Sequence, residues 1–93
     1  MLIFQANDID ELQDEMNERG TEVSIAILTM VCDSLENDVD IAEIAYIPAL
    51  DMEISVKKPH FKDALLINLA RCEEAEEYEL CQKATSWIEK LKD

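Results

Sequence analysis

The feature that most constrains the fold of this chain is a long apolar segment between Thr21 and Asn37. Its apolar residues recur at helical spacing, and they are Val23, Ala26, Ile27, Met30, Val31 and Leu35. Thr21 is a suitable N-cap for such a helix. Ile25, Leu28 and Cys32 make the opposite face apolar as well. A helix that is apolar on both faces is central in its fold or covers a partner.

The same segment is also compatible with a buried strand over residues 22–31. β-branched residues occupy every second position there, namely Val23, Ile25, Ile27, Thr29 and Val31. We favour the helix because the helical pattern continues in phase through Leu35 and the run is long for a strand.

The other segments predict further helices and one strand pair. Asn7 or Asp8 can cap a helix over about 8–19 that ends at Gly20 in the left-handed conformation. A short helix is expected from about 38 to Pro48, because its apolar residues again follow helical spacing. Residues 49–58 alternate like a strand, and residues 2–4 are its expected partner. A last helix follows Pro59 and either runs to the end or breaks near 73–79.

These elements predict a mainly α fold in a single domain over residues 1–93. It would hold three to four helices and at most one short two-stranded β pair, with an α+β fold as the alternative. One 93-residue chain can bury one core but has little room for a catalytic cavity.

The charge of the chain is strongly negative and unevenly distributed. Lys and Arg number 8 against 22 Asp and Glu, so the formal net charge is −14. Residues 1–47 carry −11 of this charge, and Arg19 is their only base. Such a field repels nucleic acids and anionic membranes, so we expect neither as a direct partner. The expected partner is a protein with a basic nucleic-acid-binding surface.

The sequence carries no pattern typical of an enzyme or of a bound cofactor. Gly20 is the single glycine, whereas phosphate-binding loops need several. Cys32, His60, Cys72 and Cys81 lack the close ligand pairs of structural zinc sites, and nine residues of continuous helix would point Cys72 and Cys81 to opposite sides. We therefore expect no catalytic residues, no metal and no cofactor. The cysteines are expected to be reduced thiols, and the acidic start without a basic, apolar leader predicts a cytoplasmic protein.

Acidic residues are the main candidates for partner binding. Carboxylates at helical spacing lie about 5–6 Å apart and can approximate a phosphate track. The candidates in the first helix are Asp10, Glu11, Asp14, Glu15 and Glu18. Those around the following turn are Asp33, Glu36, Asp38, Asp40 and Glu43. A further cluster over 73–79 either forms a solvated face or extends this negative surface.

A second hypothesis comes from a resemblance to a known family. The segments 26–33, Ala-Ile-Leu-Thr-Met-Val-Cys-Asp, and 39–45, Val-Asp-Ile-Ala-Glu-Ile-Ala, resemble the helix–turn–helix core of late-transcription coactivators of T-even-like phages. The resemblance implies a phage regulatory protein whose helical core docks on the host RNA polymerase. Ile25, Leu28 and Cys32 would then form the apolar docking face. The acidic C-terminal tail of that family has no counterpart here, because residues 87–93 read Trp-Ile-Glu-Lys-Leu-Lys-Asp.

Two other roles remain open at this point. The acidic surface can serve solubility alone, because excess negative charge opposes association. Alternatively, the chain is a structural subunit of an oligomer, and then its interface would be the C-terminal helix with Trp87 and Leu91.

Overall fold

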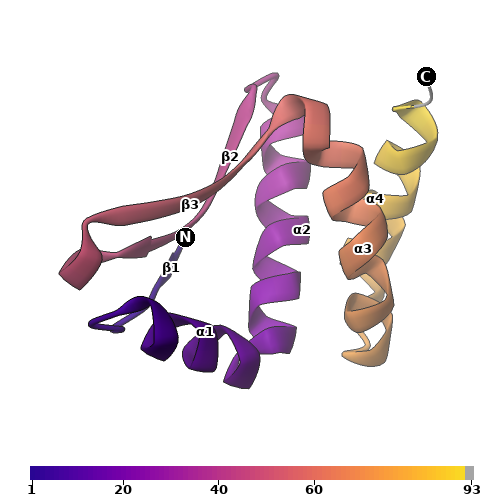
Figure 1. Cartoon of the computed structure of the whole chain (residues 1–93). Coiled ribbons are helices and arrows are strands. Elements are labelled where there is room, and N and C mark those ends of the chain that lie inside the picture. Colours follow the sequence, from indigo (N-terminus) through magenta and orange to yellow (C-terminus); the bar gives the residue numbers. More distant parts are fainter. Residues whose placement is uncertain (92–93) are drawn as a thin grey trace.

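The chain folds around one long central helix, with a small sheet on one side and a helical hairpin on the other (Figure 1). The structure is a computed structural model and describes residues 1–91. The helices are α1 (Ile9–Glu18), α2 (Gly20–Glu36), α3 (Phe61–Glu74) and α4 (Tyr78–Lys90). The strands are β1 (Leu2–Ile3), β2 (Ile41–Ile47) and β3 (Met52–Lys57), and short 3₁₀ turns cover Pro48–Leu50 and Lys58–His60. The prediction of a mainly α fold with three to four helices is thus confirmed in part. Within residues 1–91 the alternative α+β fold fits, because the sheet has three strands where one two-stranded pair was expected.

Helix α2 confirms the helical interpretation of the long apolar segment, and the alternative strand over 22–31 is wrong. Leu28, Val31 and Cys32 are fully buried on α2. Apolar residues are needed on both of its faces because α2 packs against β2 on one side and against α3 and α4 on the other. Thr21 does not cap this helix, which begins one residue earlier at Gly20 and has no side-chain cap.

Helix α1 forms where the sequence predicts it, but the role predicted for Gly20 is wrong. The Asp8 side chain accepts a hydrogen bond of 2.8 Å from the Glu11 N–H and so caps the first turn. Gly20 is the first residue of α2, and its φ is not positive. A Cβ at position 20 would collide with the Arg71 guanidinium of α3. Glycine therefore leaves room for the end of the Arg71 side chain at the junction of α1 and α2.

We expect Gly20→Ala to leave the free energy of unfolding unchanged or to raise it by up to about 1 kcal/mol. Alanine favours the helix, and Arg71 can swing aside because only the end of its side chain is in the way. Urea unfolding followed by circular dichroism measures this effect. A left-handed glycine at a helix end would give the opposite result, a loss of about 1 kcal/mol on substitution.

Strand β2 replaces the short helix that was expected between residue 38 and Pro48. Asp38 adopts a left-handed conformation, with φ 55°, and ends the α2 segment. A β-bulge between Glu43 and Ala45 then shifts the strand by one residue, so that Ala42 and Ala45 are both buried although they are three apart. The one-residue shift gives these apolar side chains the three-residue spacing of a helix. The expected helix from about 38 to Pro48 is therefore wrong.

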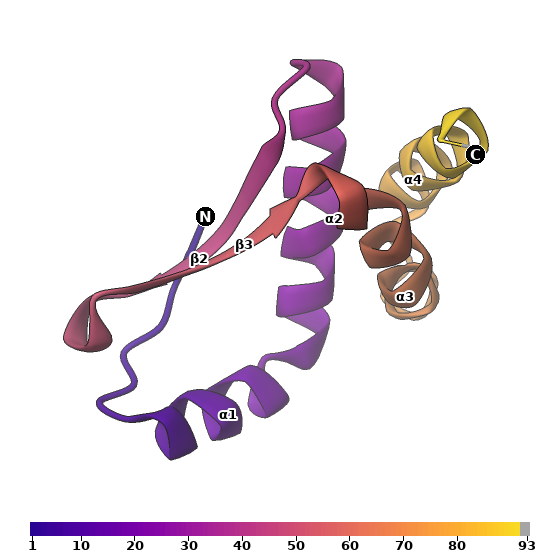
Figure 2. The ribbon, with the colours of Figure 1, turned by 45° about the horizontal axis from the view of Figure 1, so that its top comes forward.

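The sheet has the order β1-β2-β3, with β2 in the centre. Figure 2 shows β2 and β3 running together beside α2. The strand expected within 49–58 is confirmed as β3, but its expected pairing with residues 2–4 is wrong. β3 pairs antiparallel with β2, and β1 pairs parallel with the other edge of β2. β1 therefore pairs with β2, which the sequence did not predict as a strand, and not with β3.

The predicted break near 73–79 is confirmed, because α3 and α4 form an antiparallel hairpin turned at Ala75–Glu77. Glu76 has φ 61° in this turn. The reversal brings Cys72 and Cys81 into contact, so the expectation that they point to opposite sides is wrong. Trp87 and Leu91 pack against the core and are half-buried. No helix within residues 1–91 has the length and apolar character needed to cross a bilayer.

Candidate partner-binding surface

Three candidate acids form one exposed row on α1. Asp10, Asp14 and Glu18 are four residues apart, so they lie on one face of the helix at steps of about 6 Å. All three are exposed, and none makes an ion pair with another residue in 1–91. These carboxylates are available to a partner.

The other two candidates on α1, Glu11 and Glu15, are bonded to their own chain. The Asn7 N–H donates to Glu11 Oε2 at 2.8 Å, at the N-terminus of α1. The Gln5 N–H donates to Glu15 Oε1 at 3.3 Å, and Arg19 Nη1 lies 3.1 Å from Glu15 Oε2. These two acids fix the segment between β1 and α1, so their first role is structural.

The Arg19 guanidinium interacts with several groups of its own chain. Its guanidinium lies 2.7 Å from Glu22 and 3.1 Å from Glu15, and it donates to the Ile3 carbonyl at 3.1 Å. Its Cζ also lies 4.7 Å from the centre of the Phe4 ring. Hydrogen bonds from Arg19 lower the pKa of Glu22, and the two acids raise the pKa of Arg19. The only base of residues 1–47 therefore leaves the row on α1 unneutralised.

The pairing of Glu22 with Arg19 predicts a pH-dependent contribution to stability. Because the folded pKa of Glu22 is lowered from 4.5, the contribution is complete above about pH 4.5 and is lost as the pH falls through the lowered value. We expect Glu22→Gln to lower the melting temperature at pH 7 and to match the wild type at the acidic end. Thermal unfolding of both proteins from pH 7 to pH 2.5 measures this; an equal difference at every pH would contradict it.

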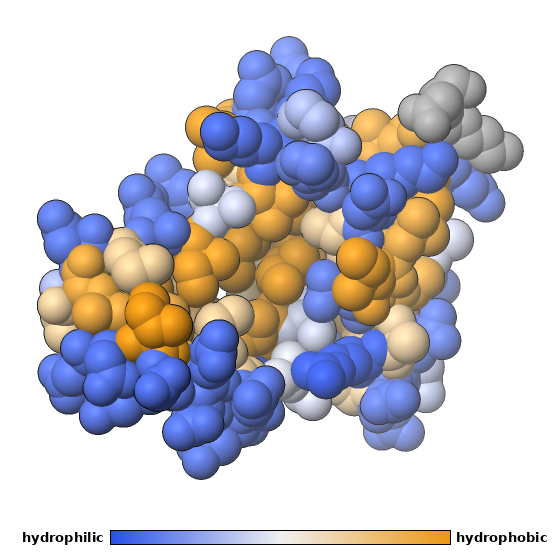
Figure 3. Space-filling model, in the orientation of Figure 1, coloured by the Kyte–Doolittle hydropathy of each residue, from blue (hydrophilic) through white to orange (hydrophobic). Residues whose placement is uncertain are grey.

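The acids of the α3–α4 turn lie at the same end of α2 as α1 (Figure 1). A groove of about 380 Å³ joins the two regions, lined by Met16, Asn17 and Gly20 on one side and by Ile67, Asn68 and Arg71 on the other. Hydrophilic side chains cover the lower edge of the molecule on both sides of this groove (Figure 3). The turn contributes Glu73, Glu74, Glu76, Glu77 and Glu79, all exposed and without an ion pair among the described residues.

We call this surface the acidic end and define it by the row on α1 and the five glutamates of the turn. It comprises Asp10, Asp14, Glu18, Glu73, Glu74, Glu76, Glu77 and Glu79. The sequence suggested this juxtaposition only as an alternative for the 73–79 cluster. The helical hairpin produces it, because the chain reverses beside the N-terminal half of α2.

The second predicted group of acids lies at the opposite end of α2. It comprises Asp33, Glu36, Asp38, Asp40 and Glu43, which are all exposed. Glu36 lies 3.6 Å from Lys83 Nζ and Asp40 lies 3.7 Å from Lys58 Nζ, so lysines partly offset this group. The 17 residues of α2 put about 25 Å between the end of α1 and this group. The row on α1 therefore does not join the second group, whereas Glu79 of the turn lines one groove with Glu36 and Lys83.

The expected apolar docking face is not available on α2. Leu28 and Cys32 are 0% and 1% exposed, because α3 and α4 cover that side of the helix. Ile25 is half-buried and lines a shallow groove next to Leu80 and Lys83. The two-faced apolar pattern reflects a central helix, and of the three residues of the expected docking face only Ile25 is partly exposed.

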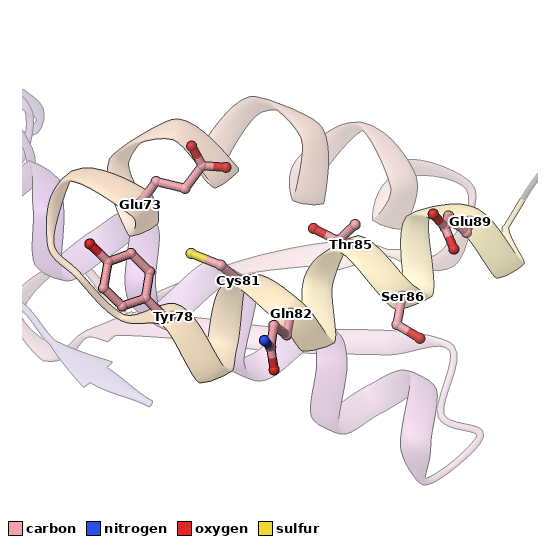
Figure 4. Close-up of a pocket in the computed structure, with 7 residues that line it drawn as sticks. All are labelled: Glu73, Tyr78, Cys81, Gln82, Thr85, Ser86 and Glu89. Atoms are coloured by element: carbon pink, nitrogen blue, oxygen red, sulfur yellow. The ribbon is translucent and has the colours of Figure 1, made fainter.

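An open depression of about 860 Å³ runs along α4 (Figure 4). Its lining residues are Glu73, Tyr78, Cys81, Gln82, Thr85, Ser86 and Glu89. No histidine or other base pairs with Cys81 among them. Elsewhere, burial raises the pKa of the Cys32 thiol to about 11. Burial and a hydrogen bond with Cys81 raise the pKa of Cys72 to about 12. Both thiols are therefore poor nucleophiles at neutral pH.

These thiol environments predict slow chemical labelling of the folded protein. At pH 8 we expect Cys32 and Cys72 to react with Ellman's reagent only as fast as the protein unfolds, because they are buried and protonated. All three cysteines should react at once in 6 M guanidinium chloride. Rapid labelling of Cys32 or Cys72 in the folded state would contradict the described packing.

Of the residues that the sequence offered as possible metal ligands or nucleophiles, Cys72 and Cys81 come together but His60 does not join the cysteines. His60 lies exposed in the turn before α3, whereas Cys32, Cys72 and Cys81 are buried. Within residues 1–91, no group of three His, Cys, Asp or Glu side chains is arranged to hold a metal ion.

Comparison of the chain with protein-family models, with curated proteins and with solved structures gave no significant match. The acidic end therefore has to be interpreted from its own geometry and charge.

Proposed function

We propose that this chain is a small, non-enzymatic regulatory protein that binds a basic nucleic-acid-binding surface of another protein through the acidic end. The observation that carries the proposal is the gathering of eight exposed, unpaired carboxylates at one end of the molecule. Such a cluster raises local attraction for a basic surface and speeds association with it.

The spacing of the row on α1 supports competition with nucleic acid. Asp10, Asp14 and Glu18 present one charge per about 6 Å of helix axis, against about 3.4 Å per phosphate on one DNA strand. The row alone thus offers about half the charge density of a strand. The five exposed glutamates of the α3–α4 turn add further negative charge at the same end of the molecule.

The charge distribution of the fold favours a binding surface at this end over one at the opposite end. Lys58 and Lys83 form ion pairs with acids of the second group, whereas Arg19 is saturated by Glu15 and Glu22 and does not neutralise the row on α1. A partner that approaches the row on α1 therefore breaks no ion pair found within residues 1–91. The exposed Arg71 lies in the groove beside this row and forms no ion pair in the described residues.

Capture from a bacterial lysate with competition by duplex DNA tests the proposal. The immobilised protein should retain nucleic-acid-binding proteins that mass spectrometry identifies. A random-sequence DNA duplex should then release them at an unchanged ionic strength, because both ligands occupy one basic surface. Retention of the same proteins in saturating duplex would show that the acidic end does not act as a substitute for nucleic acid.

A further inference from the structure

The outer edge of β3 carries unpaired backbone groups. The sheet order is β1-β2-β3, so β3 has β2 on one side and no strand of residues 1–91 on the other. The Lys58 N–H donates to the Asp40 carbonyl at 2.8 Å, so the peptide groups of Lys58 point toward the β2 side. Along a strand, residues whose peptide groups point toward one neighbour alternate with residues whose peptide groups point away from it. The peptide groups of Glu53, Ser55 and Lys57 therefore point away from β2. None of the hydrogen bonds found outside the β2–β3 ladder in residues 1–91 uses them.

The side chains at this edge are exposed and of opposite charge. Glu53, Ser55 and Lys57 share the face of the sheet that lies away from the core. Neither Glu53 nor Lys57 forms an ion pair with any described residue. On the other face, Ile54 and Val56 are only half-buried. An edge of this kind is a template for another strand.

We propose that the outer edge of β3 pairs antiparallel with the same edge of a second copy of this chain. Opposing Ser55 to itself across a two-fold axis places Glu53 opposite Lys57 of the other copy, and does so twice. In this register the outward peptide groups of residues 53, 55 and 57 all face their counterparts. Ile54 then lies beside Val56 of the other copy, so the half-buried apolar side chains cover each other.

The alternation of backbone groups supports this register over its neighbours. A shift by two residues in one direction opposes Glu53 to Pro59, which follows the strand and has no N–H to donate. The opposite shift brings in Asp51, which has a left-handed φ of 48° and accepts a hydrogen bond from Tyr46. Only the register centred on Ser55 keeps every paired residue within Met52–Lys57.

The local charge balance permits this contact in a chain of net charge −14. Two copies repel each other over most of their surfaces, but the paired edges would carry two acids and two bases. Because a short edge buries little surface, the dimer should be weak and should form at high micromolar concentrations. Added salt should strengthen the dimer, because it screens the overall repulsion while the backbone hydrogen bonds remain.

Amide hydrogen exchange at two protein concentrations tests the pairing directly. At about 20 µM the amides of Glu53, Ser55 and Lys57 should exchange rapidly, whereas those of Ile54 and Val56 are protected by β2. At about 1 mM only the former three should gain protection, by about threefold, because about a third of the chain stays monomeric for a dimer of this strength. Equal exchange of these three amides at both concentrations would overturn the proposal.

Charge reversal supplies a second test with a matched control. Lys57→Glu and Glu53→Lys should each weaken dimerisation by about tenfold in sedimentation velocity, because each replaces two attractive pairs with two repulsive ones. The double variant E53K/K57E restores opposite charges and has the wild-type net charge, so it should dimerise like the wild type. The proposal is wrong if the double variant stays as weak as the single variants, or if the wild type remains a monomer at 1 mM.

Discussion

Leu28→Ala is expected to lower the free energy of unfolding by about 2–5 kcal/mol, which is a large part of the stability of a small domain. Leu28 is 0% exposed in the middle of α2, between the sheet and the helical hairpin. The truncation would leave a cavity that neighbouring elements cannot fill without moving. Urea unfolding followed by circular dichroism measures the loss.

The matched control for this prediction is Leu66→Ala on α3. Leu66 is 49% exposed, so the same substitution should change stability by no more than about 1 kcal/mol. Together the two variants separate a core residue from a surface residue of the same type. A Leu28→Ala protein with wild-type stability would instead favour an exposed apolar face on α2, as the resemblance to phage coactivators implied.

Neutralising the row on α1 with D10N/D14N/E18Q is expected to abolish most of the capture of basic proteins. Fold and stability should be retained or slightly improved, because the three side chains make no ion pair in the described structure and repel one another. Circular dichroism and thermal unfolding check the fold, and quantitative mass spectrometry of the captured proteins checks binding. Glu15 is kept unchanged because it holds Arg19 and the Gln5 N–H.

The opposite end of α2 supplies a control of equal charge. D33N/D38N/E43Q also removes three exposed carboxylates without ion pairs and gives the same net charge of −11. If binding depended on net charge alone, both variants would lose the same fraction of captured protein. The proposal requires a much larger loss in the variant of α1, and a larger loss in the control would move the binding surface to residues 33–43.

The elements that the sequence predicted are those with local causes. Asp8 caps α1 within its own first turn, and the apolar residues of α2 keep one helical phase over their whole length. The pairs of Arg19 with Glu15 and Glu22 are also local, at four and three residues, and could have been recognised from spacing. Their recognition would have removed Glu15 from the candidate binding residues.

The features that the sequence did not predict depend on contacts between distant segments. The bulge in β2 imitates helical spacing, and only its pairing with β1 and β3 makes it a strand. Glycine at position 20 leaves room for the side chain of Arg71, which lies 51 positions later, and does not end α1 in a left-handed conformation. Likewise, the acids of α1 and of the α3–α4 turn share one end of the molecule because the hairpin folds back along α2.

Release of captured proteins by duplex DNA, compared between the wild type and D10N/D14N/E18Q, tests the central claim most directly. The account predicts that the wild type retains nucleic-acid-binding proteins until duplex is added at constant ionic strength, and that the variant retains almost none. Proteins that stay bound in saturating duplex and bind the variant equally well would contradict a nucleic-acid-like role for the acidic end.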